Sequence, residues 1–183
     1  MEPDVEILVA EDSPTQAEHV EHLLSSNGYK VTTARNGKQA LAAARNRKPT
    51  LIISDVVMPE MDGFTLCKHI KSSPELRDIP VILVTSLSTP QDVVTGLVSG
   101  ADNFIRKPFD EKYLLARVSY VLSTRELRKR ERVQLGVGIY FHGKEYFVNS
   151  DRQQILDLLI STYEEAVHIN EELEKRQGEL ASS

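Results

Sequence analysis

Short apolar runs alternate with stretches of helical periodicity from residue 5 to about residue 122. Each run is brief and rich in β-branched residues, which is typical of a strand. The predicted strands are "VEILVA" (5–10), "KVTTA" (30–34), "LIISD" (51–55), "VILVT" (81–85) and "NFI" (103–105). The stretches between them predict helices over roughly 14–26, 37–47, 64–73, 90–99 and from 110 onward.

This alternation predicts a single type of architecture. Runs that are apolar almost throughout suit parallel strands that helices cover on both faces. Strand–helix alternation then predicts an α/β fold with a doubly wound, five-stranded parallel sheet. The helix boundaries agree: Ser13 with Gln16 predicts a capping box, and Gly28 and Gly100 stand where helices end. Ligands of such sheets bind beyond the carboxyl ends of the strands.

Chemically reactive side chains follow four of the five predicted strands. They are Glu11 and Asp12 after the first strand, Asp55 at the end of the third, Thr85 and Ser86 after the fourth, and Lys107 after the fifth. Taken singly, Asp12 is explained as a helix cap, Asp55 as a turn residue and Lys107 as a surface lysine. Their joint occurrence at strand ends favours one site, because these ends meet at one edge of a parallel sheet.

Three carboxylates at one edge repel each other, since one pair about 4 Å apart costs about 4 kcal/mol at an effective dielectric near 20. A hard divalent cation relieves this repulsion. Carboxylates with a backbone carbonyl and retained water describe a Mg²⁺ site better than a Ca²⁺ cage. Lys107 adds a positive charge and Thr85 a hydroxyl donor, which together suit a phosphoryl group. A carboxylate there can act as a nucleophile and form an aspartyl-phosphate.

The chain changes character after residue 124. Residues 125–135 begin with "RELRKRER", which favours a solvated helical extension or linker over a nucleic-acid patch. Two β-rich arms around the turn at 142–144 then predict a hairpin over 136–149. A lone hairpin is marginally stable in water, so its apolar face must pack on the rest of the chain or on a second copy.

A long helix is expected over 150–183, opened by Ser150 and Gln153 as a second capping box. Its apolar residues recur in heptads. The seam residues are Leu156, Leu159, Tyr163, Ala166, Asn170, Leu173 and Leu180. Asparagine at such a position favours a defined dimer register, so we expect a parallel coiled-coil homodimer. The alternative is an amphipathic helix that folds back on the rest of the chain, which suits residues 155–163 but not the charged stretch beyond Ile169.

Composition narrows the class of protein. The chain is 40% apolar and 27% charged, the profile of a globular protein. No apolar run approaches the roughly 18 residues of a membrane span. Cys67 is the only cysteine, so an internal disulfide is excluded and a reducing, cytoplasmic location is expected. The net charge of −5 argues weakly against bulk nucleic-acid binding.

Four segments resemble, in order and in spacing, the receiver domain of two-component response regulators. They are "ILVAEDS", "LIISDVVMPEMDGF", "VILVTS" and "GADNFIRKPF". The resemblance covers residues 4 to about 122, so we assign residues 1–124 to a receiver domain. It implies a flavodoxin-like sheet with the strand order 2-1-3-4-5.

The resemblance also implies a role for each acidic residue. Asp55 is expected to be the phosphoacceptor. Asp12 and Asp55 are expected to hold Mg²⁺ together with the backbone carbonyl of Val57, while Glu11 acts mainly through water. None of these positions departs from the family pattern.

Further roles follow for the remaining site residues. Lys107 is expected to pair with the phosphoryl oxygens, beside a peptide bond to Pro108 that is cis in the family. Thr85 is expected to hydrogen-bond the phosphoryl group. Phe104 is the expected aromatic switch residue, which swings inward after Thr85 moves and alters the surface around the fourth helix, fifth strand and fifth helix.

The function expected from these observations is phosphorylation-switched signalling. A sensor histidine kinase or phosphotransfer protein supplies the phosphoryl group, and the dimeric C-terminal helix relays the change to a module beyond Ser183. The chain is expected to catalyse only its own phosphorylation and dephosphorylation. Alternatives are a free-standing phosphorelay or protein-binding regulator, a DNA-binding regulator, for which one hairpin and one helix offer little, and last a phosphatase-type hydrolase.

Overall fold

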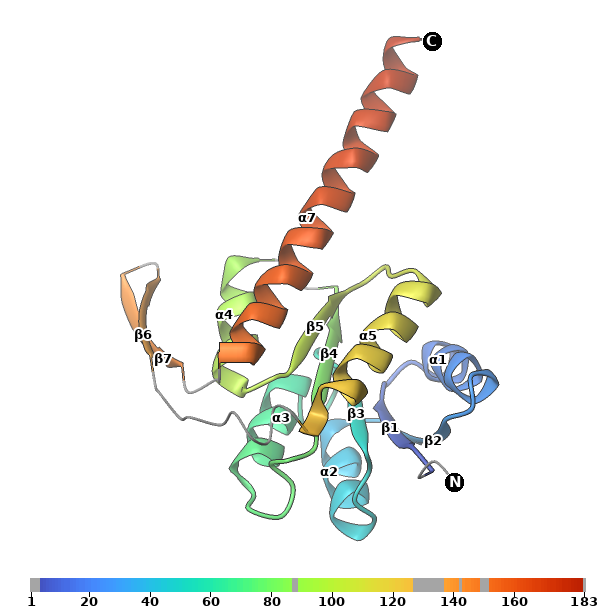
Figure 1. Ribbon diagram of the computed structural model, residues 1–183, viewed down its shortest axis with the longest axis vertical. Helices are drawn as coiled ribbons and strands as arrows, with labels where there is room; N and C mark the ends of the chain where they lie inside the picture. The colour runs from blue at the N-terminus through green and yellow to red at the C-terminus, as the bar shows by residue number, and fades with distance from the viewer. Residues whose placement is uncertain (1–3, 87–88, 127–136, 142, 149–151, 183) are drawn as a thin grey trace.

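The computed structural model describes residues 4–86, 89–126, 137–141, 143–148 and 152–182. A five-stranded parallel sheet in the order β2-β1-β3-β4-β5 lies at its centre (Figure 1). The strands are β1 (Glu6–Ala10), β2 (Lys30–Ala34), β3 (Leu51–Asp55), β4 (Val81–Thr85) and β5 (Asn103–Arg106). The helices between and after them are α1 (Pro14–Ser26), α2 (Gly37–Asn46), α3 (Gly63–Ser72), α4 (Pro90–Ser99) and α5 (Glu111–Ser123). The predicted doubly wound fold and its strand order are confirmed.

Two apolar cores lie on the two faces of the sheet, because successive strand side chains point to opposite sides. Ile52 and Leu83 pack in the core formed with α2 and α3, whereas Ile53 and Ile82 pack in the core formed with α1 and α5. The edge strand β2 differs, because only its last residue, Ala34, is buried. The other four strands are buried along nearly their whole length, and their carboxyl ends are therefore held rigidly.

Cys67 lies in the core, as its three-residue spacing from Phe64 and Ile70 predicts. Its side chain is fully buried in α3, and this burial raises the pKa of the thiol to about 12. A buried neutral thiol is chemically inert. Gly28 and Gly100 have φ angles of 89° and 85° just after α1 and α4, as expected at helix ends.

The C-terminal third contains two short strands and one long helix. β6 (Val137–Phe141) pairs antiparallel with β7 (Lys144–Val148), and α7 (Arg152–Ala181) follows. Residues 127–135 of the predicted linker, the turn residue His142 and the predicted cap at Ser150 lie outside the described residues. Among the described helices, none combines the length and the apolar character required to cross a lipid bilayer.

Helix α7 has two different environments along its length. Its first half lies against β5 and α4, between α4 and α5, and its second half projects away from the sheet (Figure 1). The fold-back arrangement considered from the sequence is therefore present along the first half of the helix, and the coiled-coil homodimer stays a prediction. Residues near 155–163 fold back on the preceding domain, and the charged stretch beyond Ile169 does not.

Candidate functional site

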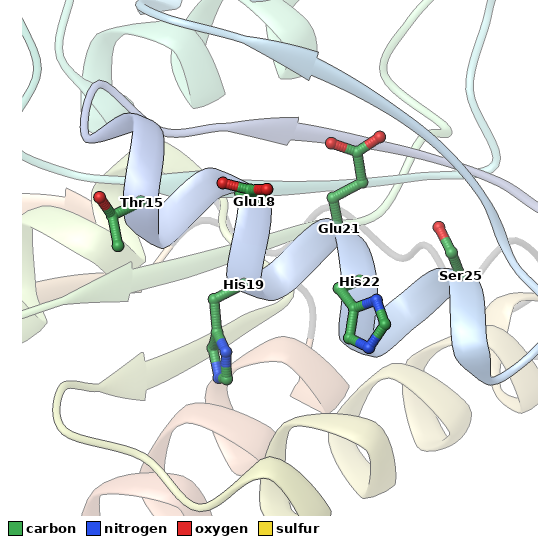
Figure 2. Close-up of a pocket in the computed structure, with 6 residues that line it drawn as sticks. All are labelled: Thr15, Glu18, His19, Glu21, His22 and Ser25. Carbon is green, nitrogen blue, oxygen red and sulfur yellow. The ribbon is translucent and has the colours of Figure 1, made fainter.

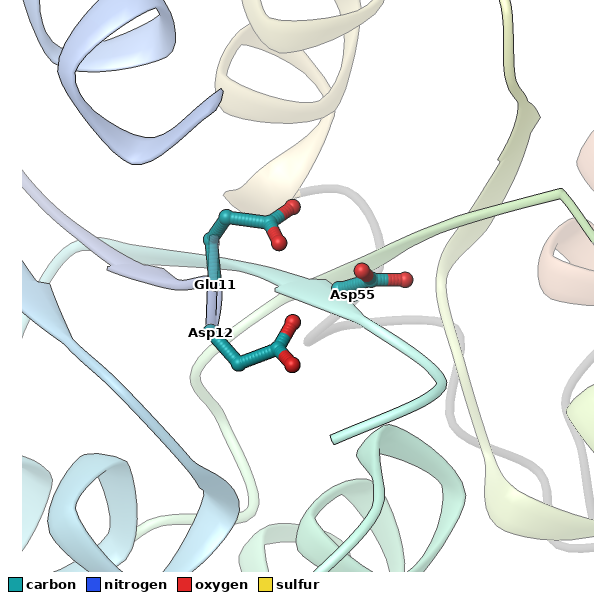
Figure 3. Close-up of side chains that lie close together, drawn as sticks. All are labelled: Glu11, Asp12 and Asp55. Carbon is teal, nitrogen blue, oxygen red and sulfur yellow. The ribbon is translucent and has the colours of Figure 1, made fainter. Parts of the chain in front are cut away.

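Three carboxylates meet at the carboxyl edge of the sheet. The pairing register places Ala10 beside Ser54, so that Glu11, directly after β1, lies next to Asp55, the last residue of β3. One carboxylate oxygen from each of Glu11, Asp12 and Asp55 lies within 4.8 Å of the others (Figure 3). These acids are far apart in the sequence, and they lie together at one edge of the sheet as the sequence predicts.

Lys107 lies among these carboxylates. Its Nζ is 2.9 Å from Glu11 Oε2 and 3.1 Å from Asp55 Oδ2. The backbone N–H of Lys107 donates to the carbonyl oxygen of Thr85 at 2.7 Å, which holds the end of β5 against the end of β4. The peptide bond from Lys107 to Pro108 is cis, as the family resemblance implied. One ammonium group therefore bridges two acids, one directly after β1 and one at the end of β3.

The electrostatics of the site follow from burial and from this pairing. Burial raises the pKa of Glu11, and the charge of Asp55 adds to the rise, while hydrogen bonds from Lys107 and Ser13 oppose it. Burial disfavours charge on Lys107, but hydrogen bonds and attraction from Glu11 and Asp55 outweigh it, so the pKa of Lys107 is raised. Three acids face one base, and the site holds an excess of negative charge when all four groups are ionised.

Of the two hydrogen bonds in the capping box predicted at α1, the one from the Ser13 N–H to the Gln16 side chain is replaced by others. Ser13 does cap the helix, because its side chain accepts from the N–H of Gln16. The side chain of Gln16, however, turns to Lys107, with 2.6 Å between Oε1 and Nζ. The N–H of Ser13 instead donates to Glu11 at 3.1 Å. A charged ammonium donor forms a stronger hydrogen bond than a backbone N–H, and Gln16 thereby becomes a site residue that the sequence did not reveal.

A close approach at Gly63 shapes the loop after Asp55. A Cβ atom at position 63 would lie 2.1 Å from the carbonyl oxygen of Asp55, so only glycine fits. The N–H of Gly63 donates to the carbonyl oxygen of Val56 at 2.8 Å. Val57 is 59% exposed, so packing of its side chain does not determine the path of the loop. Gly63 therefore fixes the chain that presents Asp55 and the carbonyl group of Val57.

The two expected switch residues lie on neighbouring strands. Thr85 is fully buried at the end of β4, directly after Val84, which pairs with Asp55. Phe104 is 7% exposed and lies in the core on the α2 and α3 side of the sheet. A Cβ at Gly96 of α4 would lie 3.3 Å from its ring. The structure therefore places Phe104 in the inward position, and its proposed swing stays a prediction.

The donor set fits Mg²⁺. This ion takes oxygen ligands at about 2.1 Å, which puts two ligands of one ion roughly 3 to 4 Å apart. One oxygen from each of Glu11, Asp12 and Asp55 lies within 4.8 Å of the others, so small side-chain adjustments would bring them to that spacing. Asp12 is exposed, which leaves room for the several water ligands that Mg²⁺ retains.

A separate hollow runs along α1. It has a volume of about 590 Å³, and its lining is Thr15, Glu18, His19, Glu21, His22 and Ser25 (Figure 2). His19 Nε2 lies 3.2 Å from Glu111 Oε1, which links α1 to α5. Its lining comes from one helix and includes none of the acids described above, so we place the chemistry at the strand ends.

Comparison with known proteins agrees with this geometry. The family model described as the response regulator receiver domain matches residues 7–119. The chain is 42% identical to the response regulator PleD of Caulobacter vibrioides over 137 residues, which is 73% of this chain and 30% of PleD. It is 39% identical to the DNA-binding dual master transcriptional regulator RpaA of Synechocystis over 116 residues, which is 63% of this chain and 48% of RpaA.

Solved structures give the same result. The signal receiver domain of a signal transduction histidine kinase from Syntrophus aciditrophicus matches with a TM-score of 0.63 and 47% identity, and covers 75% of this chain and 99% of that chain. The chemotaxis response regulator CheY4 of Vibrio cholerae matches with a TM-score of 0.62 and 33% identity. The match covers 65% of this chain and 99% of the CheY4 chain. The fold and the acidic edge define a phosphorylation-dependent signalling domain.

The chain belongs to the response regulator receiver domain family of two-component signalling. It spans 30% of the length of PleD and about half that of RpaA.

Proposed function

We propose that Asp55 accepts a phosphoryl group from a phosphohistidine on a sensor histidine kinase or phosphotransfer protein. The observation that carries this proposal is the position of Lys107, whose Nζ lies 3.1 Å from the Asp55 carboxylate and 2.9 Å from that of Glu11, while an Asp12 oxygen lies within 4.8 Å of both acids. A base shared by several acids at the open edge of a sheet suits a dianionic phosphoryl group and a divalent cation. Asp12 and Asp55 are the proposed Mg²⁺ ligands, with the carbonyl of Val57, and Glu11 acts through water.

The chemistry is an in-line displacement. A carboxylate oxygen of Asp55 attacks phosphorus, an O–P bond forms, and the N–P bond to the donor histidine breaks, with its electron pair returning to the imidazole nitrogen. Bound Mg²⁺ supplies charge neutralisation at the phosphoryl oxygens. Lys107 and the hydroxyl of Thr85 bind those oxygens, so catalysis is mainly positioning and electrostatic stabilisation. The chain itself catalyses only this step and the later hydrolysis.

The test is labelling by a small phosphodonor such as phosphoramidate in the presence of Mg²⁺, measured by intact-protein mass spectrometry. Asp55→Asn is expected to abolish the added phosphoryl mass. Asp62→Asn is the matched control, because Asp62 lies in the same loop and caps α3, a role that asparagine also performs. Undiminished labelling of Asp55→Asn, with normal labelling of Asp62→Asn, would refute the assignment.

We further propose that α7 forms a parallel coiled-coil homodimer. Five large seam residues are between 42% and 76% exposed in the single chain, namely Leu156, Leu159, Tyr163, Leu173 and Leu180. Ala166 and Asn170, which complete the seam, are exposed as well. Seven-residue spacing of exposed leucines is the pattern that a second copy of the helix buries. Light scattering of the intact chain is expected to give the dimer mass at micromolar concentration, and a monomer mass would contradict this proposal.

The proposed output is a module joined to the end of α7. PleD and RpaA, which this chain resembles over part of their length, extend well beyond the shared segment. A free-standing phosphorelay or protein-binding regulator is the second candidate, supported by the length of helix that projects beyond the sheet (Figure 1). A DNA-binding output is a less favoured proposal, and we expect no nucleic-acid binding by residues 1–183.

A further inference from the structure

A charged contact joins the long helix to α5 of the receiver domain. Glu164 of α7 forms an ion pair with Arg117 of α5, and the hydroxyl of Tyr113 lies 3.5 Å from the same carboxylate oxygen of Glu164. The guanidinium of Arg117 also lies 5.1 Å from the centre of the Tyr113 ring, a cation–π contact. The Arg117 side chain is only 12% exposed. The Glu164 side chain is 47% exposed, so the pair is sheltered from water on the Arg117 side only.

The surface under α7 consists of elements that adjoin the acidic site. Helix α7 contacts β5 and α4, besides its contact with α5. Strand β5 ends at Arg106, and the next residue is Lys107, which holds Asp55. Phe104 of β5 lies against Gly96 of α4. A displacement of Lys107 or Phe104 therefore acts on two of the three elements that α7 touches.

Docking on the receiver and pairing with a second copy use different sides of α7. Glu164 lies about 100° around the helix from the seam residue Tyr163, which is 71% exposed although it adjoins the docking contact. Leu156 and Leu159 are also exposed in this half of the helix. The seam is thus open along the docked half, and a dimer can form while both receivers remain attached.

We infer that the α4–β5–α5 surface is the docking site for the first half of α7 in the same chain, and that phosphorylation of Asp55 changes this docking. This response to phosphorylation rests on the proposed function of Asp55. The interaction of the Glu164 carboxylate with Arg117 and Tyr113 holds α7 on this surface. Helix α7, which leads toward the proposed output, therefore responds directly to changes in the α4–β5–α5 surface, and no partner protein is needed for this step.

The docking is tested by the distance between spin labels on introduced cysteines at positions 45 of α2 and 175 of α7. Both positions are exposed, and native Cys67 is buried and inert, so it escapes labelling. Labelled chain diluted into excess unlabelled chain gives mainly intramolecular distances. A narrow distribution is expected for the docked helix, and a broad one would overturn the docking.

Glu164→Arg is expected to broaden and shift this distribution, because it places two positive charges together. Exchanging the charges, with Arg117→Glu in addition, is expected to narrow it again. Glu171→Arg is the matched control, since it makes the same change at the equivalent position one heptad later, where α7 projects from the sheet, and it is expected to have no effect. An unchanged distribution in Glu164→Arg overturns the docking contact, and Glu164 is exposed enough for that variant to fold.

The response to phosphorylation is tested with beryllofluoride and Mg²⁺, with bound beryllofluoride followed by fluorine NMR. The label distance is expected to shift in the wild type and not in Asp55→Asn. A bound fluorine signal with no shift in distance contradicts the coupling alone. Absence of a bound signal contradicts the acceptor site, and the coupling with it.

Discussion

Two partly buried lysines pair with carboxylates at opposite edges of the same sheet. At the amino edge, Lys71 lies 2.8 Å from Asp102. Its Nζ also donates to the carbonyl oxygen of Ile79 at 2.8 Å, and Asp102 accepts in turn from the N–H of Val81 at 2.8 Å. At the carboxyl edge, Lys107 contacts Glu11 and Asp55, with Asp12 close by.

The difference between these clusters is the balance of charge. The amino-edge pair has one base and one acid, so its charges cancel. Lys71 and Asp102 also hydrogen-bond to backbone groups, so this pair has no excess charge for a ligand to neutralise. The carboxyl-edge cluster has three acids for one base. Buried excess charge is tolerated only where something else neutralises it. The unbalanced edge is therefore the functional one, and the balanced edge is structural.

Breaking the balanced pair is expected to have the largest effect on stability. Lys71→Met leaves the carboxylate of Asp102, which is 5% exposed, without its counter-ion. Losing one partner of a buried pair costs about 3–5 kcal/mol of unfolding free energy. Urea denaturation measures this loss, and Mg²⁺ is expected to stabilise the variant as much as the wild type. A loss below about 1 kcal/mol would show that the pair is not structural.

Removing the base from the unbalanced edge is expected to impair chemistry more than folding. Lys107→Met is expected to lower the rate of labelling by phosphoramidate about 100-fold, which corresponds to about 2.7 kcal/mol. Its destabilisation is expected to be smaller than that of Lys71→Met, because Mg²⁺ can take over part of the charge of Lys107. Lys112→Met, an exposed lysine in the first turn of α5, is the control. Equal labelling rates for the two variants would contradict the role of Lys107.

Removing one acid from the unbalanced edge is expected to stabilise the protein when Mg²⁺ is absent. Asp12→Asn relieves repulsion from Glu11 and Asp55 and is expected to raise the unfolding free energy in EDTA by about 1 kcal/mol. The stabilisation that Mg²⁺ gives the wild type is expected to disappear, because a proposed ligand is lost. Thermal unfolding with and without Mg²⁺ measures both effects. Retained stabilisation by Mg²⁺ would exclude Asp12 as a ligand.

The smallest expected effect is on pH dependence. Burial raises the pKa of Glu11 above its ordinary value of 4.5, so the folded state holds this proton longer than the unfolded chain does. The contribution of Glu11 to stability is present below pH 4.5 and is lost as the pH rises through the folded value. Relative to Glu11→Gln, the wild type in EDTA is therefore expected to lose stability as the pH rises from 4.5 to neutrality, which urea denaturation at several pH values measures. Parallel stability curves for the two proteins would contradict this assignment.

The predicted strand ends were a sound guide because the elements are locally encoded. All five strand runs and the boundaries of α1 and α4 agree with the sequence pattern, since apolar period, proline and glycine act over a few residues. Gln16 shows where this reasoning stops. Its spacing from Ser13 predicts a local hydrogen bond, but Lys107, 91 residues later, competes for the same side chain. The pair Lys71–Asp102 was missed for the same reason, as nothing local marks it.

The sequence by itself determined the alternation of strands and helices, the reactive residues at the strand ends and the heptad seam of the last helix. Only the tertiary structure decided which acids share Lys107, how Gln16 is used, and that Glu164 fastens α7 to Arg117 while the seam stays exposed. The physical reason is the range of the forces involved. Periodicity and capping act between near neighbours in the chain, whereas ion pairs are chosen among all charges that folding brings within a few ångströms.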